Sequence, residues 1–252
     1  MSKILSLDTE CTGLFISKGC RAFTVSACSS VTSQIYLWHF PVDPYDRSVT
    51  YPQEQIDNIL SIIYSHDTLV FHNGNYDLQV LAAISASLHW STLFKSHSIH
   101  DTMLMSHAFK SSDRHGLKEN AIQYLKYPDD DERALEEATK KSRTIAKKYN
   151  WCIADKNDLH ESLVGTQKSH YRCDYWIPKA IAQYLKYPLD HPWHSICDTY
   201  AGKDAERTLG LFLVLSETMQ SIPNTSAYHS PVHPLEYLPP ITYTGTLYDK
   251  YE

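Results

Sequence analysis

The chain has 252 residues, of which 42% are hydrophobic, and a formal net charge of −6. This length suits one large α/β domain, or one domain with a small appendage, and the negative charge argues against a protein that coats nucleic acid non-specifically. The six cysteines form no CxxC motif, and no stretch of the sequence is apolar enough to span a membrane. We therefore expect a soluble protein of a reducing, cytoplasmic compartment, with no membrane partner.

Most of the chain has a regular pattern of strands and helices. Segments rich in β-branched and aromatic residues predict strands, and apolar residues at helical spacing predict helices. The predicted strands cover residues 4–7, 21–30, 34–40, 67–71 and 97–99. The predicted helices cover residues 52–64, 76–84, 102–109, 116–125 and 198–220. We expect the first three strands to form an antiparallel meander, because short turns suffice to join them.

The stretch 129–197 departs from this pattern. Its first part, 129–149, is acidic at the front and basic at the back, which is the charge order that a helix dipole favours. The part from 151 to 192 is mixed and less periodic, and we expect an elaboration on the core. The order of elements predicts an α/β protein with a ribonuclease H-like mixed β-sheet flanked by helices, and a helical or irregular insertion before the last helix. Residues 1–220 then form one domain, and the proline-rich tail 221–252 is a docking or linker segment.

Four carboxylates stand where a predicted strand meets a turn or a helix. Asp8 and Glu10 close the first strand and, being two residues apart, point to one face of the sheet. Asp77 opens the helix after the fourth strand. Asp204 lies near the start of the final helix, four residues after Tyr200 and on the same helical face. Converging carboxylates repel one another unless divalent cations lie between them, and Mg²⁺ and Mn²⁺ prefer oxygen ligands.

Each of these features alone also has an ordinary explanation. Acidic residues are common at turns, and Asp77 suits the first turn of any helix. A tyrosine four residues before an aspartate is common in amphipathic helices. Their joint occurrence, in this order and at these structural positions, is what indicates a two-metal site for phosphodiester chemistry.

Three stretches carry a resemblance to a known family: LSLDTECTGL at 5–14, VFHNGNYDLQVL at 70–81 and YAGKDAERTLGL at 200–211. On these motifs the chain resembles the DnaQ-like, DEDD-type 3′–5′ exonucleases, in the subclass with tyrosine in the third motif. It is most similar to the proofreading exonuclease domain of family A DNA polymerases. HDTMLMSHAF at 100–109 and HGLKENAIQYL at 115–125 are similar to the segment that follows the second motif in those domains.

The resemblance implies an enzyme that removes nucleoside 5′-monophosphates from single-stranded or frayed DNA 3′ ends. It implies two divalent cations, Mg²⁺ or Mn²⁺. Asp8, Glu10 and Asp204 are assigned to one of them, and Asp8 bridges to the second, near Asp77. Tyr200 is expected to orient the attacking water, since a phenol with a pKa of about 10 is a poor base at neutral pH.

The same resemblance implies a set of substrate-binding residues. Thr9 is expected to offer its backbone N–H to the terminal nucleotide, Leu14 to wedge against the last base, and Asn73 to contact the penultimate nucleotide. We interpret Asp101 as a helix N-cap. A DNA polymerase is the implied partner. The tail over 233–249 weakly resembles the start of a polymerase region, so we expect either an excised domain or a separate subunit.

Two interpretations from other classes stay open. The chain is alternatively a 3′–5′ exoribonuclease that trims RNA ends, since spacing alone does not select deoxyribose over ribose. Or it is a non-catalytic module that binds a polymerase or single strands. The intact set of carboxylates, together with Tyr200, argues against the second.

The insertion holds further candidate residues. One group is a basic run that we interpret as a solvated helix face rather than a nucleic-acid contact. It consists of Lys140, Lys141, Arg143, Lys147 and Lys148. A second group is aromatic, and either stacks on bases or forms a small core. It consists of Tyr149, Trp151, Tyr171, Tyr175 and Trp176. A third group we interpret as scattered loop residues rather than a structural zinc site, because no CxxC pair anchors it. It consists of Cys152, His160, His170, Cys173, His191, His194 and Cys197.

Overall fold

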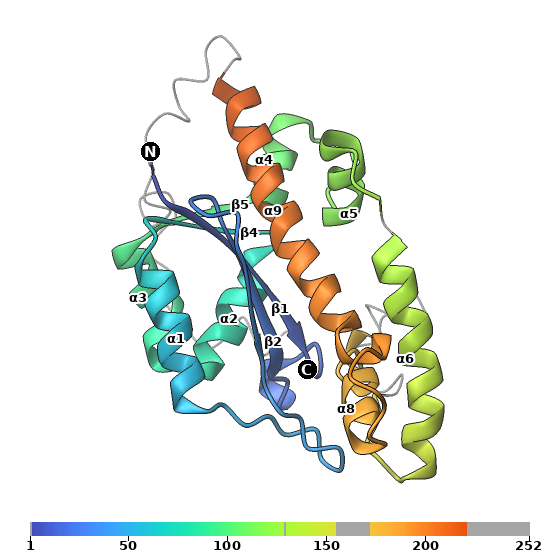
Figure 1. The fold of residues 1–252 in the computed structure, drawn as a ribbon. Helices are drawn as coiled ribbons and strands as arrows, with labels where there is room; N and C mark the ends of the chain where they lie inside the picture. Colours follow the sequence, from blue (N-terminus) through green and yellow to red (C-terminus); the bar gives the residue numbers. More distant parts are fainter. Residues whose placement is uncertain (1, 129, 155–171, 221–252) are drawn as a thin grey trace, which may run out of the picture.

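The computed structural model describes residues 2–128, 130–154 and 172–220 (Figure 1). The tail 221–252, with its resemblance to the start of a polymerase region, lies outside the described residues. No helix in the described part of the chain is both long and apolar enough to cross a membrane.

A mixed five-stranded sheet lies at the centre, with the strand order β3-β2-β1-β4-β5. The strands are β1 Ile4–Cys11, β2 Ala22–Ser29, β3 Ile35–His39, β4 Thr68–Phe71 and β5 Ser98–Asp101. β2 pairs antiparallel with β1 and β3, whereas β4 pairs parallel with β1 and β5. The predicted α/β class, the mixed sheet and the five strands are therefore present.

β1 is longer than predicted, and this is a correction. Asp8 and Glu10 do not close the strand; they lie within it, opposite Ser26 and Thr24 of β2. The sequence pattern ends at Leu7 because the apolar run ends there. Pairing with the long β2 nevertheless keeps the backbone extended as far as Cys11.

Helices cover both faces of the sheet. The α-helices are α1 Gln53–Tyr64, α2 Gly74–Ile84, α3 Trp90–Ser96, α4 Thr102–Phe109, α5 Leu117–Asn120, α6 Asp130–Lys148, α8 Ile177–Tyr184 and α9 Ile196–Gln220. α1, α2 and α3 lie on one side of the sheet and α9 on the other, with α6 and α8 beyond α9 (Figure 1). The sequence did not predict α3, which is too short to show a helical period. It also predicted one helix over 116–125, where α5 ends at Asn120 and continues as the π-helix η3, Ala121–Leu125.

The described part of the insertion is a packed helical layer. Trp151, Tyr175 and Trp176 are buried with residues of α6, α8 and α9, so these aromatics form a core rather than a stacking surface. Arg143 is also buried, which corrects its prediction as part of a solvated face, whereas Lys147 and Lys148 are exposed as predicted. Of the predicted aromatics, Tyr171 lies outside the described residues.

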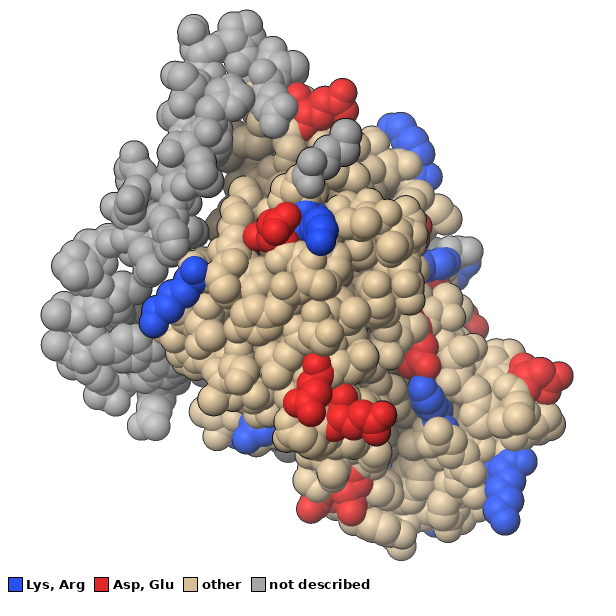
Figure 2. Space-filling model, turned by 60° about the vertical axis from the view of Figure 1, so that its left-hand side comes forward, with Lys and Arg blue, Asp and Glu red and all other residues tan. Residues whose placement is uncertain are grey.

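The face formed by α1, α2 and α3 carries few charged side chains. Figure 2 brings this side forward and shows mostly uncharged residues, with a few basic ones and with some acidic ones side by side. A nucleic acid therefore finds no continuous basic surface in this view, in keeping with the net charge of −6.

Candidate active site

The two faces of β1 position the site. Side chains alternate along a strand, so Ser6, Asp8 and Glu10 share one face, while Leu7 and Thr9 share the other. On the first face, the Ser6 hydroxyl donates a hydrogen bond of 2.6 Å to a backbone carbonyl of α9, that of Ala205. This contact brings α9 close to the sheet beside Asp8 and Glu10.

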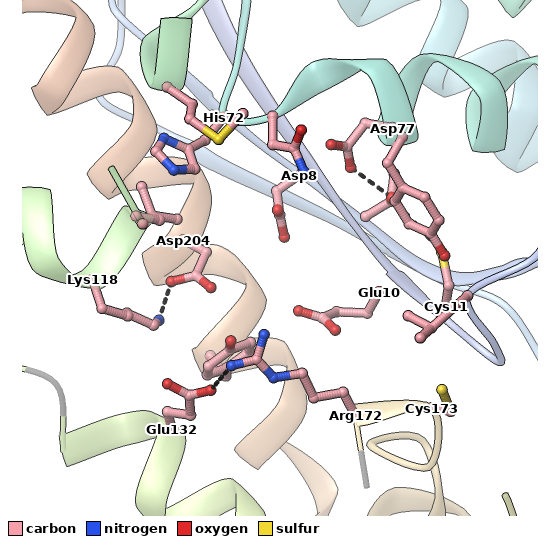
Figure 3. A pocket seen from close by; sticks show the side chains of 18 of the residues that line it. Asp8, Glu10, Cys11, His72, Asp77, Lys118, Glu132, Arg172, Cys173 and Asp204 are labelled. Atoms are coloured by element: carbon pink, nitrogen blue, oxygen red, sulfur yellow. Dashed lines mark hydrogen bonds and ion pairs between the residues drawn. The ribbon is translucent and has the colours of Figure 1, made fainter. Parts of the chain in front are cut away.

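Three carboxylates meet there. One oxygen each of Asp8, Glu10 and Asp204 lies within 4.8 Å of the others (Figure 3). The Oδ2 atom of Asp8 is buried and has no hydrogen-bond partner among the described residues. An unpartnered buried carboxylate oxygen is unfavourable unless a cation neutralises it, so the three residues fit a metal ion with oxygen ligands.

Within residues 2–128, 130–154 and 172–220, this is the only group of three or more histidine, cysteine or acidic side chains that could hold a metal ion. Cys152, Cys173, Cys197, His191 and His194 join no such group with any other described residue. The other two zinc candidates from the sequence, His160 and His170, lie outside the described residues.

Asp77 approaches from the opposite face of β1. It is buried in the first turn of α2, and the Thr9 hydroxyl donates a hydrogen bond of 2.7 Å to its Oδ1 atom. Asp77 lines the same cavity as the three carboxylates but is not a member of their close group. The side chain of Thr9 therefore holds a site carboxylate, a role that the sequence did not reveal.

The turn before α2 is fixed by Asp101. This carboxylate caps α4 by accepting from Met103 N at 2.9 Å, as the sequence predicted. It also accepts from the backbone N–H groups of Asn73, at 3.1 Å, and Gly74, at 2.8 Å. Asn73 has a left-handed φ of 62°, a conformation that Asn tolerates better than most residues. One side chain thus ties two strand-to-helix turns together and holds Asn73 at the cavity.

Burial and neighbouring like charges raise the pKa values of the site carboxylates. Burial, reinforced by the charges of Glu10, Asp77 and Asp204, raises the pKa of Asp8 well above its ordinary value. Burial and the charge of Asp204 raise the pKa of Glu10 to about 8. Burial raises the pKa of Asp77 to about 7, against the hydrogen bond from Thr9. The protein alone therefore does not supply enough positive charge to hold the pKa values of these carboxylates at their ordinary level.

Tyr200 lies beside them on α9. Its side chain is buried, and burial together with the charges of Asp204 and Glu10 raises the pKa of its phenol well above the ordinary value. The Lys118 ammonium lies 4.3 Å from the centre of its ring and forms an ion pair with Asp204. The phenol consequently stays protonated at neutral pH, so it could donate a hydrogen bond but would be a poor base.

All eight residues predicted from the sequence line one cavity of about 440 Å³. They are Asp8, Thr9, Glu10, Leu14, Asn73, Asp77, Tyr200 and Asp204. Leu14 also lines a second, adjacent cavity, so it stands at the border between the two. Segments from three distant parts of the chain therefore converge on one space.

Sequence reasoning missed the charged partners of the site. Arg207 donates to Asp204 at 2.8 Å and to Asp131 at 2.6 Å, and Lys118 lies 3.5 Å from Asp131. Burial alone would raise the pKa of Asp131, but the hydrogen bond from Arg207 and the charge of Lys118 lower it to about 2. Arg207 follows Asp204 by three residues and could have been found from helical spacing. Lys118 and Arg172, which also line the cavity, carry no such signal.

No family model matches this chain, and no curated protein matches its sequence. The motifs and the geometry of the carboxylate site are therefore what bears on function.

Proposed function

We propose that the chain is a metal-dependent 3′–5′ exonuclease that removes nucleoside 5′-monophosphates from single-stranded or frayed DNA ends. The observation that carries this proposal is the convergence of Asp8, Glu10 and Asp204 around a buried, unpartnered carboxylate oxygen, with Asp77 and Tyr200 in the same cavity. The strand order, with β1 antiparallel to β2 and parallel to β4, supports a ribonuclease H-like fold for this enzyme.

Two divalent cations, Mg²⁺ or Mn²⁺, complete the proposed site. Asp8, Glu10 and Asp204 would hold one of them, and Asp8 with Asp77 would hold the other. An all-oxygen donor set suits these two ions. When bound, such a pair lowers the pKa of a water and stabilises the leaving oxygen of a phosphodiester.

The chain's own residues hold and orient the reacting groups. The protonated Tyr200 hydroxyl orients the attacking water by a hydrogen bond, and Glu10 accepts from the same water. Thr9 keeps Asp77 in place through its side-chain hydroxyl, while its backbone N–H is offered to the terminal nucleotide. Leu14, at the border of the cavity, packs against the last base.

The proposed biological role is proofreading for a family A DNA polymerase, as a separate subunit or as a domain. Asn73, held by Asp101, contacts the penultimate nucleotide in this proposal. A site for single-stranded ends favours mismatched termini, since a mispaired end has already lost a few kcal/mol of stacking and pairing.

Digestion of 5′-labelled oligonucleotides tests the proposal. The substrates are single-stranded DNA, duplex DNA with a matched or a mismatched 3′ end, and RNA of the same sequence, each with Mg²⁺, Mn²⁺ or EDTA. We expect a ladder that shortens from the 3′ end, faster on single-stranded and mismatched DNA, and abolished by EDTA. Absence of a ladder with either metal contradicts the function, whereas a ladder on RNA alone identifies a ribonuclease.

A further inference from the structure

Arg172 reaches the cavity from the insertion, outside the family-like motifs. Figure 3 shows its side chain extending between Glu10 and Glu132. Its Nη2 atom donates to Glu132 Oε1 on α6 at 2.5 Å, and the side chain remains 59% exposed. It lines the cavity together with Glu10 and Tyr200.

The other cations near the carboxylates are already engaged. Arg207 is 2% exposed and is bonded to both Asp131 and Asp204. Lys118 is 17% exposed, contacts the same two carboxylates and stands over the ring of Tyr200. Neither can turn toward a ligand without giving up a contact to a buried carboxylate.

Arg172 is more exposed than Arg207 and Lys118, and it is paired with one carboxylate rather than two. A guanidinium has five N–H donors in a planar fork, and among the described residues its one hydrogen-bond acceptor is Glu132. Donors therefore remain for a ligand in the cavity. An ion pair at this level of exposure contributes little to stability, about 0–1 kcal/mol. Glu132 holds the guanidinium at the cavity, beside Glu10.

We propose that Arg172 binds a phosphate group of the nucleic-acid 3′ end, with Glu132 as the residue that positions it. This inference rests on the proposed exonuclease function and adds to it a substrate-binding residue from the insertion. Paired N–H donors match two oxygens of a phosphate, and the positive charge offsets the repulsion between the substrate and the uncompensated carboxylates.

Binding of a fluorescent single-stranded oligothymidylate, followed by anisotropy in EDTA and again in Ca²⁺, tests the inference without relying on cleavage. The variants are Arg172→Gln and Arg172→Lys, with Arg133→Gln as the matched control. Arg133 is exposed on α6 and lies outside the cavity lining. We expect Arg172→Gln to bind about tenfold more weakly, as for a lost hydrogen bond to a charged group. Arg172→Lys should lie in between, and Arg133→Gln should bind like wild type.

Salt dependence adds a second readout. The slope of log K against log salt should fall by about 0.7 in Arg172→Gln, as for one lost contact to a single-strand phosphate, and stay unchanged in Arg133→Gln. Thermal melting of Arg172→Gln and Arg133→Gln should match wild type, which separates lost binding from lost folding. If Arg172→Gln binds like Arg133→Gln while wild type cleaves DNA, Arg172 is wrongly assigned and the exonuclease stands. If wild type neither binds nor cleaves, both proposals fail.

Discussion

Two carboxylates with buried oxygens meet opposite surroundings in this molecule. Asp174, in the helical layer, is fully buried, and it forms an ion pair with Arg143 and accepts from Ala154 N at 3.0 Å. Asp8, on the sheet, has a buried oxygen without a partner among the described residues and faces Glu10 and other acids. Burying a carboxylate is costly in either place.

The difference shows what each region is built for. In the helical layer the protein supplies its own cation, so the charge is neutralised as soon as the chain folds. At the sheet, Lys118 and Arg207 each pair with Asp204 and Asp131, and the pKa of Asp8 is still raised because burial and like charges dominate. A site left short of positive charge is suited to an external cation, whereas a complete ion pair is suited to holding elements together.

The largest expected effect is on cleavage. The double variant Asp8→Asn, Glu10→Gln removes two proposed metal-binding charges, and we expect the rate of DNA cleavage to fall at least about a thousandfold. Gel assays of 5′-labelled single-stranded DNA measure this. Glu54→Gln, on the exposed face of α1, is the control and should cleave normally. Cleavage at the wild-type rate by the double variant would show that Asp8 and Glu10 do not take part in the reaction.

The next effect concerns the helical layer. Asp174→Asn removes the anionic charge from the buried ion pair with Arg143, and we expect the free energy of unfolding to fall by about 3–5 kcal/mol. Urea denaturation, with and without Mg²⁺, measures this loss, which should be the same in both because the pair lies outside the proposed metal site. Asp57→Asn, on the exposed side of α1, should change little. A small loss of unfolding free energy in Asp174→Asn would show that the Asp174–Arg143 ion pair does not hold the helical layer together.

The sheet half of this comparison could be predicted from the sequence, and for a physical reason. Strand alternation and helical spacing are local patterns, so Asp8, Glu10 and Asp204 could be assigned to elements whose geometry fixes where side chains point. The end of β1 could not be found in this way. It depends on pairing with β2, a contact with residues that are distant in sequence.

The helical half was less predictable because ion pairs depend on packing. Arg143 stands in a basic run, yet it falls on the stripe of α6 that carries buried Leu135 and Ala146. Its helical phase was a usable signal for burial. Lys118 and Arg172 gave none, since their carboxylate partners come from other parts of the chain.

The third prediction is a pH dependence that metal abolishes. In the metal-free protein the pKa of Glu10 is raised from 4.5 to about 8 and that of Asp77 from 3.8 to about 7. Such carboxyls bind protons more tightly in the folded state than in the unfolded one. Stability should therefore fall as pH rises from about 4 to 8, by on the order of a few kcal/mol. Thermal melting in EDTA across this range measures the fall, and Mg²⁺ or Mn²⁺ should flatten it. If stability falls equally with pH with and without metal, a bound cation does not neutralise the site carboxylates.

The smallest effect has the opposite sign to most substitutions. Asp8→Asn removes a carboxyl whose ionised form is disfavoured by burial and by the neighbouring acids, so in EDTA at pH 8 we expect the free energy of unfolding to rise by about 1 kcal/mol. At pH 5 less of the unfolded-state carboxylate is lost on folding, so Asn should then make a smaller difference than at pH 8. Urea denaturation at both pH values measures this, beside Asp174→Asn, which should destabilise at both because it removes the buried ion pair with Arg143. With Mn²⁺ present the gain at pH 8 should vanish or reverse, since the variant lacks a ligand. Destabilisation by Asp8→Asn in EDTA at pH 8 would instead make Asp8 a structural carboxylate of the same kind as Asp174.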